Sequence, residues 1–395
     1  MKKILALVIA AIMVFGLVAC TGGSEEPKTE VDTSAYKVAM ITDYGDITDE
    51  SFNQTTYEAC KAFCEEYAID FNYFKPAGDS TADRGALIEN AVAENYNVIV
   101  MPGYAFGGAI VEAAADYPDV KFIALDVAAG DLLEAAVPAK GESYDYNPDN
   151  WKLEDYVDLS NVYCAIFQEE LCGYMAGYAA VKLGYEKLGF LGGMAVPAVI
   201  RYGYGFVQGA DAAAKELDKK IDLNYVYGGQ FFADGDITAV MDTWYQGGTE
   251  VVFACGGGIY GSAGEAAQKA GGKVIGVDVD QAAIIDGKYG EGITVTSAMK
   301  GLYPATYDTL KDAIINDNWA AYAGKIATLG LVADGESYVQ IPEKSTQFED
   351  GKFTLDDYKA LVADMVAGKI TVSADISAMP AVTNTTISDQ GAIKG

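Results

Sequence analysis

The chain has 395 residues, 51% of them hydrophobic, with 57 acidic side chains, 27 basic ones and no histidine. This length exceeds one ordinary core and predicts two globular domains, and the hydrophobic content excludes a disordered chain. A formal net charge of −30 disfavours nucleic acid and anionic lipid as partners, because both are negatively charged. The lack of histidine removes the commonest general base and the commonest metal ligand, which argues against an enzyme.

The first 19 residues are typical of a secretory signal peptide. Lys2 and Lys3 precede an unbroken apolar run over residues 4–19, which is short for a membrane-spanning helix. The run ends in Leu-Val-Ala before Cys20 and resembles the lipobox of bacterial lipoproteins, in which this cysteine carries the lipid. Residues 20–35 are polar and punctuated by Gly and Pro, so we expect a flexible tether there. The sequence therefore predicts a protein held by a lipid on Cys20 at the extracytoplasmic face of the cell membrane.

From residue 36 onward, short apolar segments alternate with amphipathic ones. The first half predicts strands over 37–41, 69–74, 98–101 and 121–125, with helices over 51–67, 81–94 and 106–116. The second half predicts strands over 161–166, 187–191, 222–227, 251–255 and 273–277, with helices over 171–183, 202–217, 237–246 and 260–270. Strict alternation of this kind predicts an α/β fold with parallel sheets joined by right-handed crossovers.

Two stretches depart from the alternation. Residues 128–159 carry an excess of acidic side chains together with Pro138, Gly141 and Pro148, so we expect a surface insertion at the boundary between two lobes. The tail predicts a strand from 293, a helix over 303–315, a hairpin around Gly335 and a last helix over 355–367.

The two halves share a local layout, which predicts two similar lobes facing each other across a cleft. Residues 38–43 resemble 188–193, and residues 122–126 resemble 274–278. We expect an N-terminal lobe of residues 36–160 plus about 293–325, and a C-terminal lobe of residues 161–292 plus about 326–395. Because the chain returns after the second lobe, several hinge crossings are expected, as clamshell closure requires.

The loop after the first strand carries the clearest set of candidate binding residues. Asp43 stands at the end of the strand, Asp49 or Ser51 can cap the next helix, and Phe52 lies beside Asn53. Loops at the carboxyl ends of strands hold the ligands of open α/β sheets. The loop therefore predicts a site for a flat polar molecule, with a solvated loop and helix cap as the alternative.

The sequence offers no catalytic constellation. Ser262 is not in a Gly-x-Ser-x-Gly elbow, and neither a Gly-x-x-x-x-Gly-Lys phosphate loop nor a dinucleotide fingerprint occurs. The acidic pairs Asp234/Asp236 and Asp278/Asp280 suit solvated turns better than a Ca²⁺ site, so we expect no metal and no cofactor. Besides Cys20 there are five cysteines, an odd number that does not indicate a disulfide framework, and we expect most of them to be buried apolar side chains: Cys60, Cys64, Cys164, Cys172 and Cys255.

Several motifs in one order resemble the basic-membrane-protein type of lipoproteins, which include purine nucleoside receptors of ABC importers. The motifs are the run from Thr42 to Gln54, Tyr-Pro-Asp-Val-Lys-Phe at 117–122, Tyr-Met-Ala-Gly at 174–177, Gly-Phe-x-Gly-Gly-Met at 189–194, Val-Ile-Gly-Val-Asp-x-Asp-Gln at 274–281 and Thr-Ser-x-Met-Lys at 296–300. The resemblance implies a type I periplasmic-binding-protein fold with a three-crossing hinge. It also implies a receptor that presents its solute to the transmembrane subunits of an ABC permease, and we expect the protein to be a monomer.

The same resemblance implies a ligand site, residue by residue. Phe52 would stack on one face of a purine base and Phe231 on the other, with Phe232 as the alternative to Phe231. Asp43, Asn53 and Asp126 would bind the edge of the base. Gly257, Asp278 and Lys300 would hold the ribose.

One departure from the family pattern leaves the ligand open. The glycine-rich run over 256–261 contains the bulky residues Ile259 and Tyr260, next to the expected ribose site. Two alternatives therefore stand beside the nucleoside: another flat or sugar-like solute such as a flavin, and a surface sensor or adhesion-type lipoprotein of the same fold without a transport partner.

Overall fold

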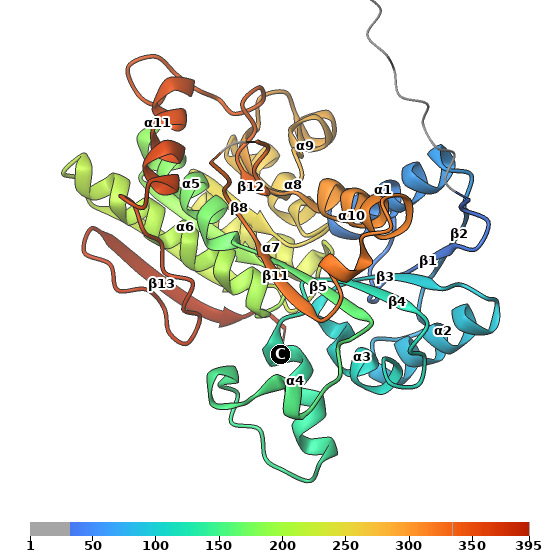
Figure 1. Ribbon diagram of the computed structural model, residues 1–395. Helices are drawn as coiled ribbons and strands as arrows, with labels where there is room; N and C mark the ends of the chain where they lie inside the picture. The colour runs from blue at the N-terminus through green and yellow to red at the C-terminus, as the bar shows by residue number, and fades with distance from the viewer. Residues whose placement is uncertain (1–31, 334, 395) are drawn as a thin grey trace, which may run out of the picture. The chain divides into compact units, whose positions relative to one another are not determined.

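The computed structural model describes residues 32–333 and 335–394, which form two lobes (Figure 1). The expected signal peptide, Cys20 and most of the expected tether lie outside the described residues. In the described part, no helix combines the length and the apolar composition needed to cross a membrane. All five cysteines in this part are free and buried, as the sequence predicted for most of them.

The first lobe is built on a six-stranded parallel sheet with the order β11-β5-β4-β3-β1-β2. Its elements are β1 (Lys37–Ile41), α1 (Phe52–Glu66), β2 (Asp70–Phe74), α2 (Thr81–Ala93), β3 (Val98–Pro102), α3 (Gly107–Ala113), β4 (Lys121–Leu125), α4 (Ala129–Ala139), β5 (Val162–Phe167), α10 (Leu302–Leu310) and β11 (Lys325–Leu329).

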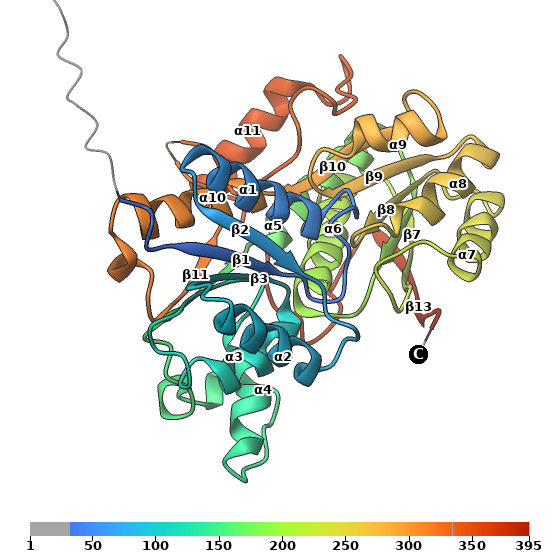
Figure 2. The ribbon, with the colours of Figure 1, turned by 90° about the vertical axis from the view of Figure 1, so that its right-hand side faces the viewer.

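Helices cover both faces of this sheet, with α1 and α10 on one side and α2, α3 and α4 on the other (Figure 2). Side chains alternate between the faces along each strand, so Val38 and Met40 pack toward α1 while Ala39 and Ile41 pack toward α2. Both faces of the sheet are therefore shielded from solvent, which explains why these strands are continuous apolar runs in the sequence.

The second lobe repeats the arrangement on a seven-stranded sheet, β12-β10-β9-β8-β6-β7-β13, in which only the β10–β12 pair is antiparallel. Its elements are α5 (Glu169–Lys182), β6 (Lys187–Gly192), α6 (Pro197–Glu216), β7 (Ile221–Tyr227), α7 (Gly235–Gln246), β8 (Val251–Cys255), α8 (Tyr260–Ala270), β9 (Lys273–Asp278), α9 (Ala282–Tyr289), β10 (Thr294–Lys300), β12 (Val339–Gln340), α11 (Leu355–Val366) and β13 (Thr385–Ala392).

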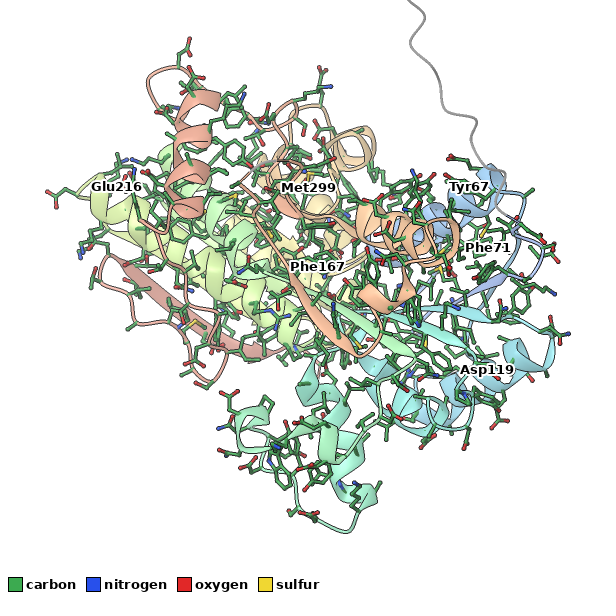
Figure 3. All side chains as sticks on the ribbon, viewed as in Figure 1. Tyr67, Phe71, Asp119, Phe167, Glu216 and Met299 are labelled. Atoms are coloured by element: carbon green, nitrogen blue, oxygen red, sulfur yellow. The ribbon has the colours of Figure 1, made fainter. Side chains whose placement is uncertain are left out.

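The chain passes between the lobes three times: from β5 to α5, from β10 to α10, and from β11 to β12. Phe167, the last residue of β5, lies inside the molecule at the first crossing, whereas Glu216 at the end of α6 points outward (Figure 3). Two matching α/β lobes with three crossings are the type I periplasmic-binding-protein fold that the sequence predicted.

The limits of the lobes differ from those expected at 160/161 and 292/293, and the limit expected at about 325/326 falls inside β11, which belongs to the first sheet. Strand β5 was expected in the C-terminal lobe but belongs to the sheet of the first lobe. Strand β10 was expected in the N-terminal lobe but belongs to the sheet of the second lobe. The chain changes lobe at the carboxyl ends of these strands, beside the cleft, and not in the loops that precede them. Sheet pairing decides the boundary, and composition does not reveal it.

Three further differences concern single elements. The expected insertion at 128–159 begins with the regular helix α4, whose Leu132 and Val137 are buried, so only its remainder is an excursion. The two strands on either side of Gly335 do not pair with each other as a hairpin would require, because β11 pairs with β5 and β12 pairs with β10. Strand β13 was not expected, since its sequence is polar and most of it is exposed at the sheet edge.

Candidate functional site

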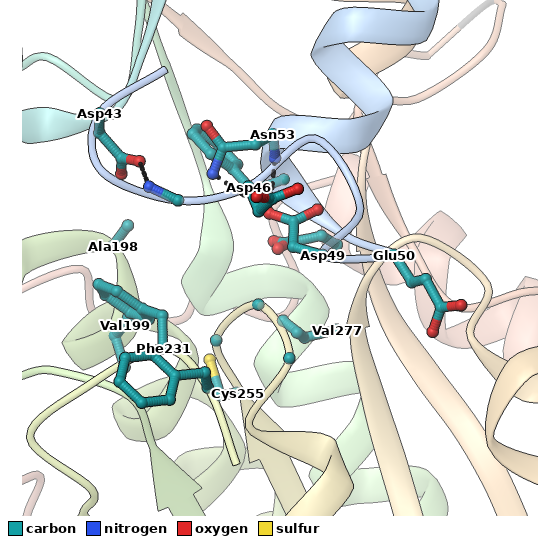
Figure 4. A pocket seen from close by; sticks show the side chains of 18 of the residues that line it. Asp43, Asp46, Asp49, Glu50, Asn53, Ala198, Val199, Phe231, Cys255 and Val277 are labelled. Atoms are coloured by element: carbon teal, nitrogen blue, oxygen red, sulfur yellow. Dashed lines mark hydrogen bonds between the residues drawn. The ribbon is translucent and has the colours of Figure 1, made fainter. Parts of the chain in front are cut away.

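A cavity of about 550 Å³ lies between the lobes, and the loops at the carboxyl ends of the strands line it. Figure 4 shows the loop with Asp43, Asp49 and Asn53 from the first lobe facing Phe231 and Val277 from the second. The volume lies within the range of about 300–1,000 Å³ that is usual for small-molecule sites.

The structure brings every residue that the sequence assigned to the ligand to this one cavity. The lining contains Asp43, Phe52, Asn53, Asp126, Phe231, Gly257, Asp278 and Lys300, together with the alternative Phe232. Their convergence follows from the fold, because Asp43, Asp126 and Asp278 each stand where a parallel strand ends. What these residues bind stays a prediction.

The loop between β1 and α1 is fixed by its own carboxylates. Oδ1 of Asp43 accepts hydrogen bonds from the backbone N–H groups of Tyr44 (2.6 Å) and Gly45 (2.7 Å). Burial raises the pKa of Asp43, and these hydrogen bonds only partly oppose the effect. The carboxylate of Asp49 accepts from the backbone N–H groups of Ser51 and Asn53, at 3.0 and 2.9 Å. Asp49 is therefore the side chain that caps α1, which the sequence left open between Asp49 and Ser51.

Ser51 instead connects the two lobes. Its hydroxyl donates to Oδ2 of Asp278 at 2.6 Å, and Tyr202 donates to Oδ1 of the same carboxylate at 3.3 Å. Both Asp278 and Asp126 have the left-handed backbone conformation, with φ of 65° and 61°, so each turns sharply out of its strand into the cavity.

Lys300 is the centre of a buried charge cluster at the inner end of the cavity. Its side chain is 2% exposed, and its Nζ lies 2.5 Å from Asp126, 3.4 Å from Glu169 and 4.0 Å from Asp278. Arg201 binds the other oxygen of Glu169 at 2.7 Å. These pairings offset the large cost of removing the charges from water. Burial alone would lower the pKa of Lys300, but the surrounding carboxylates raise it overall.

Two acceptors at the cavity have no hydrogen-bond partner among the described residues: Oδ1 of Asn53 and Oδ1 of Asp126. Burial raises the pKa of Asp126 to about 6, although Lys300 beside it acts in the opposite direction. Buried acceptors are nearly always satisfied in folded proteins. A ligand with N–H or O–H donors would complete both groups.

The second aromatic wall is held in place by glycines. A Cβ atom on Gly193 would lie 2.3 Å from Cδ1 of Phe231, so the ring lies directly on the backbone there. The carbonyl of Phe231 accepts from the N–H of Gly258 at 2.9 Å, and the neighbouring Gly257 has a φ of 51°. Phe232 also lines the cavity but is 60% exposed. The packing therefore favours Phe231 over Phe232 as the ring that faces a ligand.

A second connection between the lobes was missed from the sequence. The carboxylate of Glu50, in the first lobe, accepts hydrogen bonds from the hydroxyl of Tyr260 and from Nζ of Lys288 (2.7 Å), both in the second lobe. Lys288 also donates to the Tyr260 hydroxyl at 2.8 Å. We call these three residues, all of which line the cavity, the clasp. The bulk of Tyr260 within a glycine-rich run was the only signal that pointed to it.

The fold and the cavity define a solute-binding protein: two α/β lobes with a three-crossing hinge that enclose a ligand-sized space between their strand ends. The family model described as ABC transporter substrate-binding protein PnrA-like (Bmp) matches residues 36–362, and the chain belongs to this family. It is therefore the solute-binding component of an ABC transporter and not an enzyme.

The chain is also similar to individual relatives and to a solved structure. An uncharacterised lipoprotein of Pyrococcus abyssi is 27% identical over 352 residues, which cover 86% of this chain and 77% of the relative. The ABC transporter nucleoside-binding protein BmpA of Lactococcus lactis is 27% identical over 307 residues, covering 73% of this chain and 76% of that protein. A crystal structure of an ABC transporter solute-binding protein from Aeropyrum pernix matches with a TM-score of 0.66 at 19% identity, over 86% of this chain and 94% of that one, and shows the same fold.

Proposed function

We propose that the chain binds a purine nucleoside in the cavity between its lobes and delivers it to the transmembrane subunits of an ABC importer. The observation that carries the proposal is one cavity with aromatic rings from both lobes, Phe52 and Phe231, and with the unpartnered acceptors of Asn53 and Asp126. The nucleoside-binding relative from Lactococcus lactis supports the same choice.

In this proposal the base lies between the rings of Phe52 and Phe231. Stacking of a base on an aromatic side chain stabilises binding by about 1–3 kcal/mol per base. Asp43, Asn53 and Asp126 accept hydrogen bonds from N–H groups at the edge of the base. An analogue without those donors leaves buried acceptors unpaired, and such sites reject it strongly.

The ribose lies at Gly257, Asp278 and Lys300. Asp278 already accepts from Ser51 and Tyr202, but an ionised carboxylate offers about four lone-pair positions, which leaves capacity for sugar hydroxyls. Lys300 already faces carboxylates on several sides, so its main effect there is to pair with Asp126 and Asp278 and to orient them. Gly257 lets the backbone approach the sugar closely.

The proposal places the protein outside the cell membrane, anchored by a lipid on Cys20 and acting as a monomer. Relatives described as lipoproteins support the anchor. Replacement of Cys20 by Ser is expected to move the protein from the membrane fraction to the soluble extracytoplasmic fraction. An unchanged membrane fraction would contradict the anchor without touching the ligand assignment.

Isothermal titration with inosine, guanosine, adenosine, riboflavin and ribose tests the ligand. We expect at least one nucleoside to bind with a Kd below about 100 μM, which corresponds to about −5.5 kcal/mol. Riboflavin or ribose binding more tightly than every nucleoside would transfer the assignment to the alternative solute. If nothing in the panel binds, the nucleoside proposal fails, and a search for a permease partner decides between transport and sensing.

Two variants test the pocket itself. Phe52→Ala and Asp278→Ala are each expected to weaken nucleoside binding at least tenfold, because one removes a stacking face and the other a carboxylate at the sugar. Phe232→Ala is the matched control, since its exposed ring contributes little contact. Unchanged affinity in both pocket variants would exclude this arrangement of the ligand.

A further inference from the structure

The turn that carries Phe231, residues 228–236, contacts a segment that lies outside the family match. The family model matches residues 36–362, whereas the segment 363–394 continues beyond it and adds β13 to the edge of the second sheet. In Figure 2, β13 runs beside β7. The segment therefore reaches the end of the sheet where the cavity lies.

Side-chain contacts fasten the segment along its length. Gln208 exchanges two hydrogen bonds with the backbone of Ser373, at 2.9 and 3.0 Å. Asp211 accepts from the backbone N–H groups of Thr383 (3.1 Å) and Asn384 (2.6 Å). These contacts fix where β13 begins.

The direction of β13 determines where it delivers the chain. It pairs with β7 in parallel, from Thr385 opposite Ile221 to Ala392 opposite Tyr227. The N–H of Ile393 then donates to the carbonyl of Tyr227 at 2.8 Å. Because parallel strands end at the same edge of a sheet, residues 393 and 394 arrive at the carboxyl end of β7, directly before the turn.

Lys394 closes a small polar group at the base of the turn. Its Nζ contacts the carboxylate of Asp234 and lies 3.3 Å from Oε1 of Gln230. Gln230 in turn donates to Asp234 at 2.9 Å, and Asp234 caps α7 through the N–H of Ile237 at 3.0 Å. Gly229 has a φ of 82°, and a Cβ there would lie 2.6 Å from the carbonyl oxygen of Lys394, so the two backbones touch.

We propose that Lys394 is a positioning residue for the ligand site: through Gln230 and Asp234 it holds the turn that presents Phe231 to the cavity before a ligand arrives. If the turn that carries Phe231 is ordered before the ligand binds, binding does not include the entropy cost of ordering this turn. Preorganisation of the turn therefore increases affinity. The effect on affinity rests on the proposed function, because it requires Phe231 to contact the ligand. The effect on the order of the turn does not.

The first experiment needs no ligand. Hydrogen–deuterium exchange is compared between the wild-type chain, Lys394→Gln and Lys220→Gln. Lys220 is the matched control, because its Nζ donates to the carbonyl of Thr383 at 2.7 Å and so holds the same segment just before β13 begins. We expect faster exchange over residues 228–236 in Lys394→Gln only. Equal exchange in all three proteins, or equally faster exchange in both variants, would overturn the proposal.

The second experiment measures affinity for the nucleoside that the wild-type chain binds best. We expect Lys394→Gln to raise the Kd about three- to tenfold, Lys220→Gln to leave it within twofold, and Lys394→Gln to have no further effect in a Phe231→Ala background. An equal loss in both backgrounds, or no loss in either, would show that Lys394 does not act through the ring. If no nucleoside binds the wild-type chain, the proposed function fails, and the exchange experiment alone decides the positioning role.

Discussion

The clasp predicts that Tyr260→Phe weakens ligand binding. This substitution removes a hydroxyl that bonds another side chain of the protein, across the two lobes, and not the ligand. Glu50 lies in the first lobe, and Tyr260 and Lys288 lie in the second. Their hydrogen bonds exist only while the lobes are closed. The ligand is held in the closed form of the protein. A contact that is made only in the closed form increases the population of that form, and the apparent affinity for the ligand rises with it.

The expected magnitude follows from the burial of the three groups. A hydrogen bond to a charged group contributes about 1.5–3 kcal/mol. Glu50 is 30% exposed and keeps Lys288 as a partner, so we expect a loss nearer 1–2 kcal/mol, or about 5- to 30-fold in Kd. Lys288 is 48% exposed, and Lys288→Ala is expected to cost only about 0.2–1 kcal/mol, because solvent screens this ion pair.

The assay is isothermal titration combined with stopped-flow measurement of ligand dissociation. Most of the loss is expected in the dissociation rate, because the clasp forms as the lobes close around a ligand that has already entered. Tyr245→Phe is the matched control: its hydroxyl donates to the carbonyl of Lys273 at 2.6 Å, inside the second lobe. The reasoning is refuted if Tyr260→Phe changes neither Kd nor dissociation by more than twofold, or if Tyr245→Phe weakens binding as much.

Two further predictions concern the packing of Phe231 against Gly193 and the dependence of folding stability on pH. Gly193→Ala is expected to displace Phe231 and weaken binding about tenfold, because overpacking costs about 1–3 kcal/mol; titration showing unchanged affinity would contradict this. Burial raises the pKa of Glu170 to about 7, so the folded state binds this proton more tightly and stability falls as the pH rises from about 5 to 8. Urea unfolding should show Glu170→Gln to be more stable than wild type at pH 8, by about 2–3 kcal/mol, and equal at pH 4.5; a pH-independent difference would be inconsistent with titration of Glu170.

The alternation of strands and helices was predictable because both faces of each sheet are covered. Strands such as β3, buried along its whole length, leave continuous apolar runs that the sequence displays. β13 leaves no such run, since it is an exposed edge strand held by backbone pairing to β7. The lobe limits could not be predicted from the sequence for a related reason. Strands β5 and β10 have the composition of any central strand, and only their pairing assigns them to a sheet.

The candidate site was predictable where it depends on strand ends and unpredictable where it depends on lobe closure. Asp43, Asp126 and Asp278 follow recognisable strands, so their convergence at one edge follows from a parallel sheet. Glu50 becomes part of the site through Tyr260 and Lys288 of the second lobe, which are more than 200 residues away in the chain. No local periodicity records such contacts.

The charges around the cavity favour a neutral ligand rich in hydrogen-bond donors. Each lysine in the described lining already faces a carboxylate: Lys75 contacts Asp46 at 2.8 Å, Lys288 contacts Glu50, and Lys300 contacts Asp126. None of these ammonium groups is left to neutralise an added phosphate, whereas the acceptors of Asn53 and Asp126 are unfilled. A phosphorylated solute would have to break an existing ion pair and enter a strongly acidic surround, while a solute that offers only N–H and O–H groups satisfies the cavity as it stands. The arrangement of charge therefore favours a neutral solute that carries N–H and O–H donors, and such a solute is compatible with the aromatic walls of the cavity.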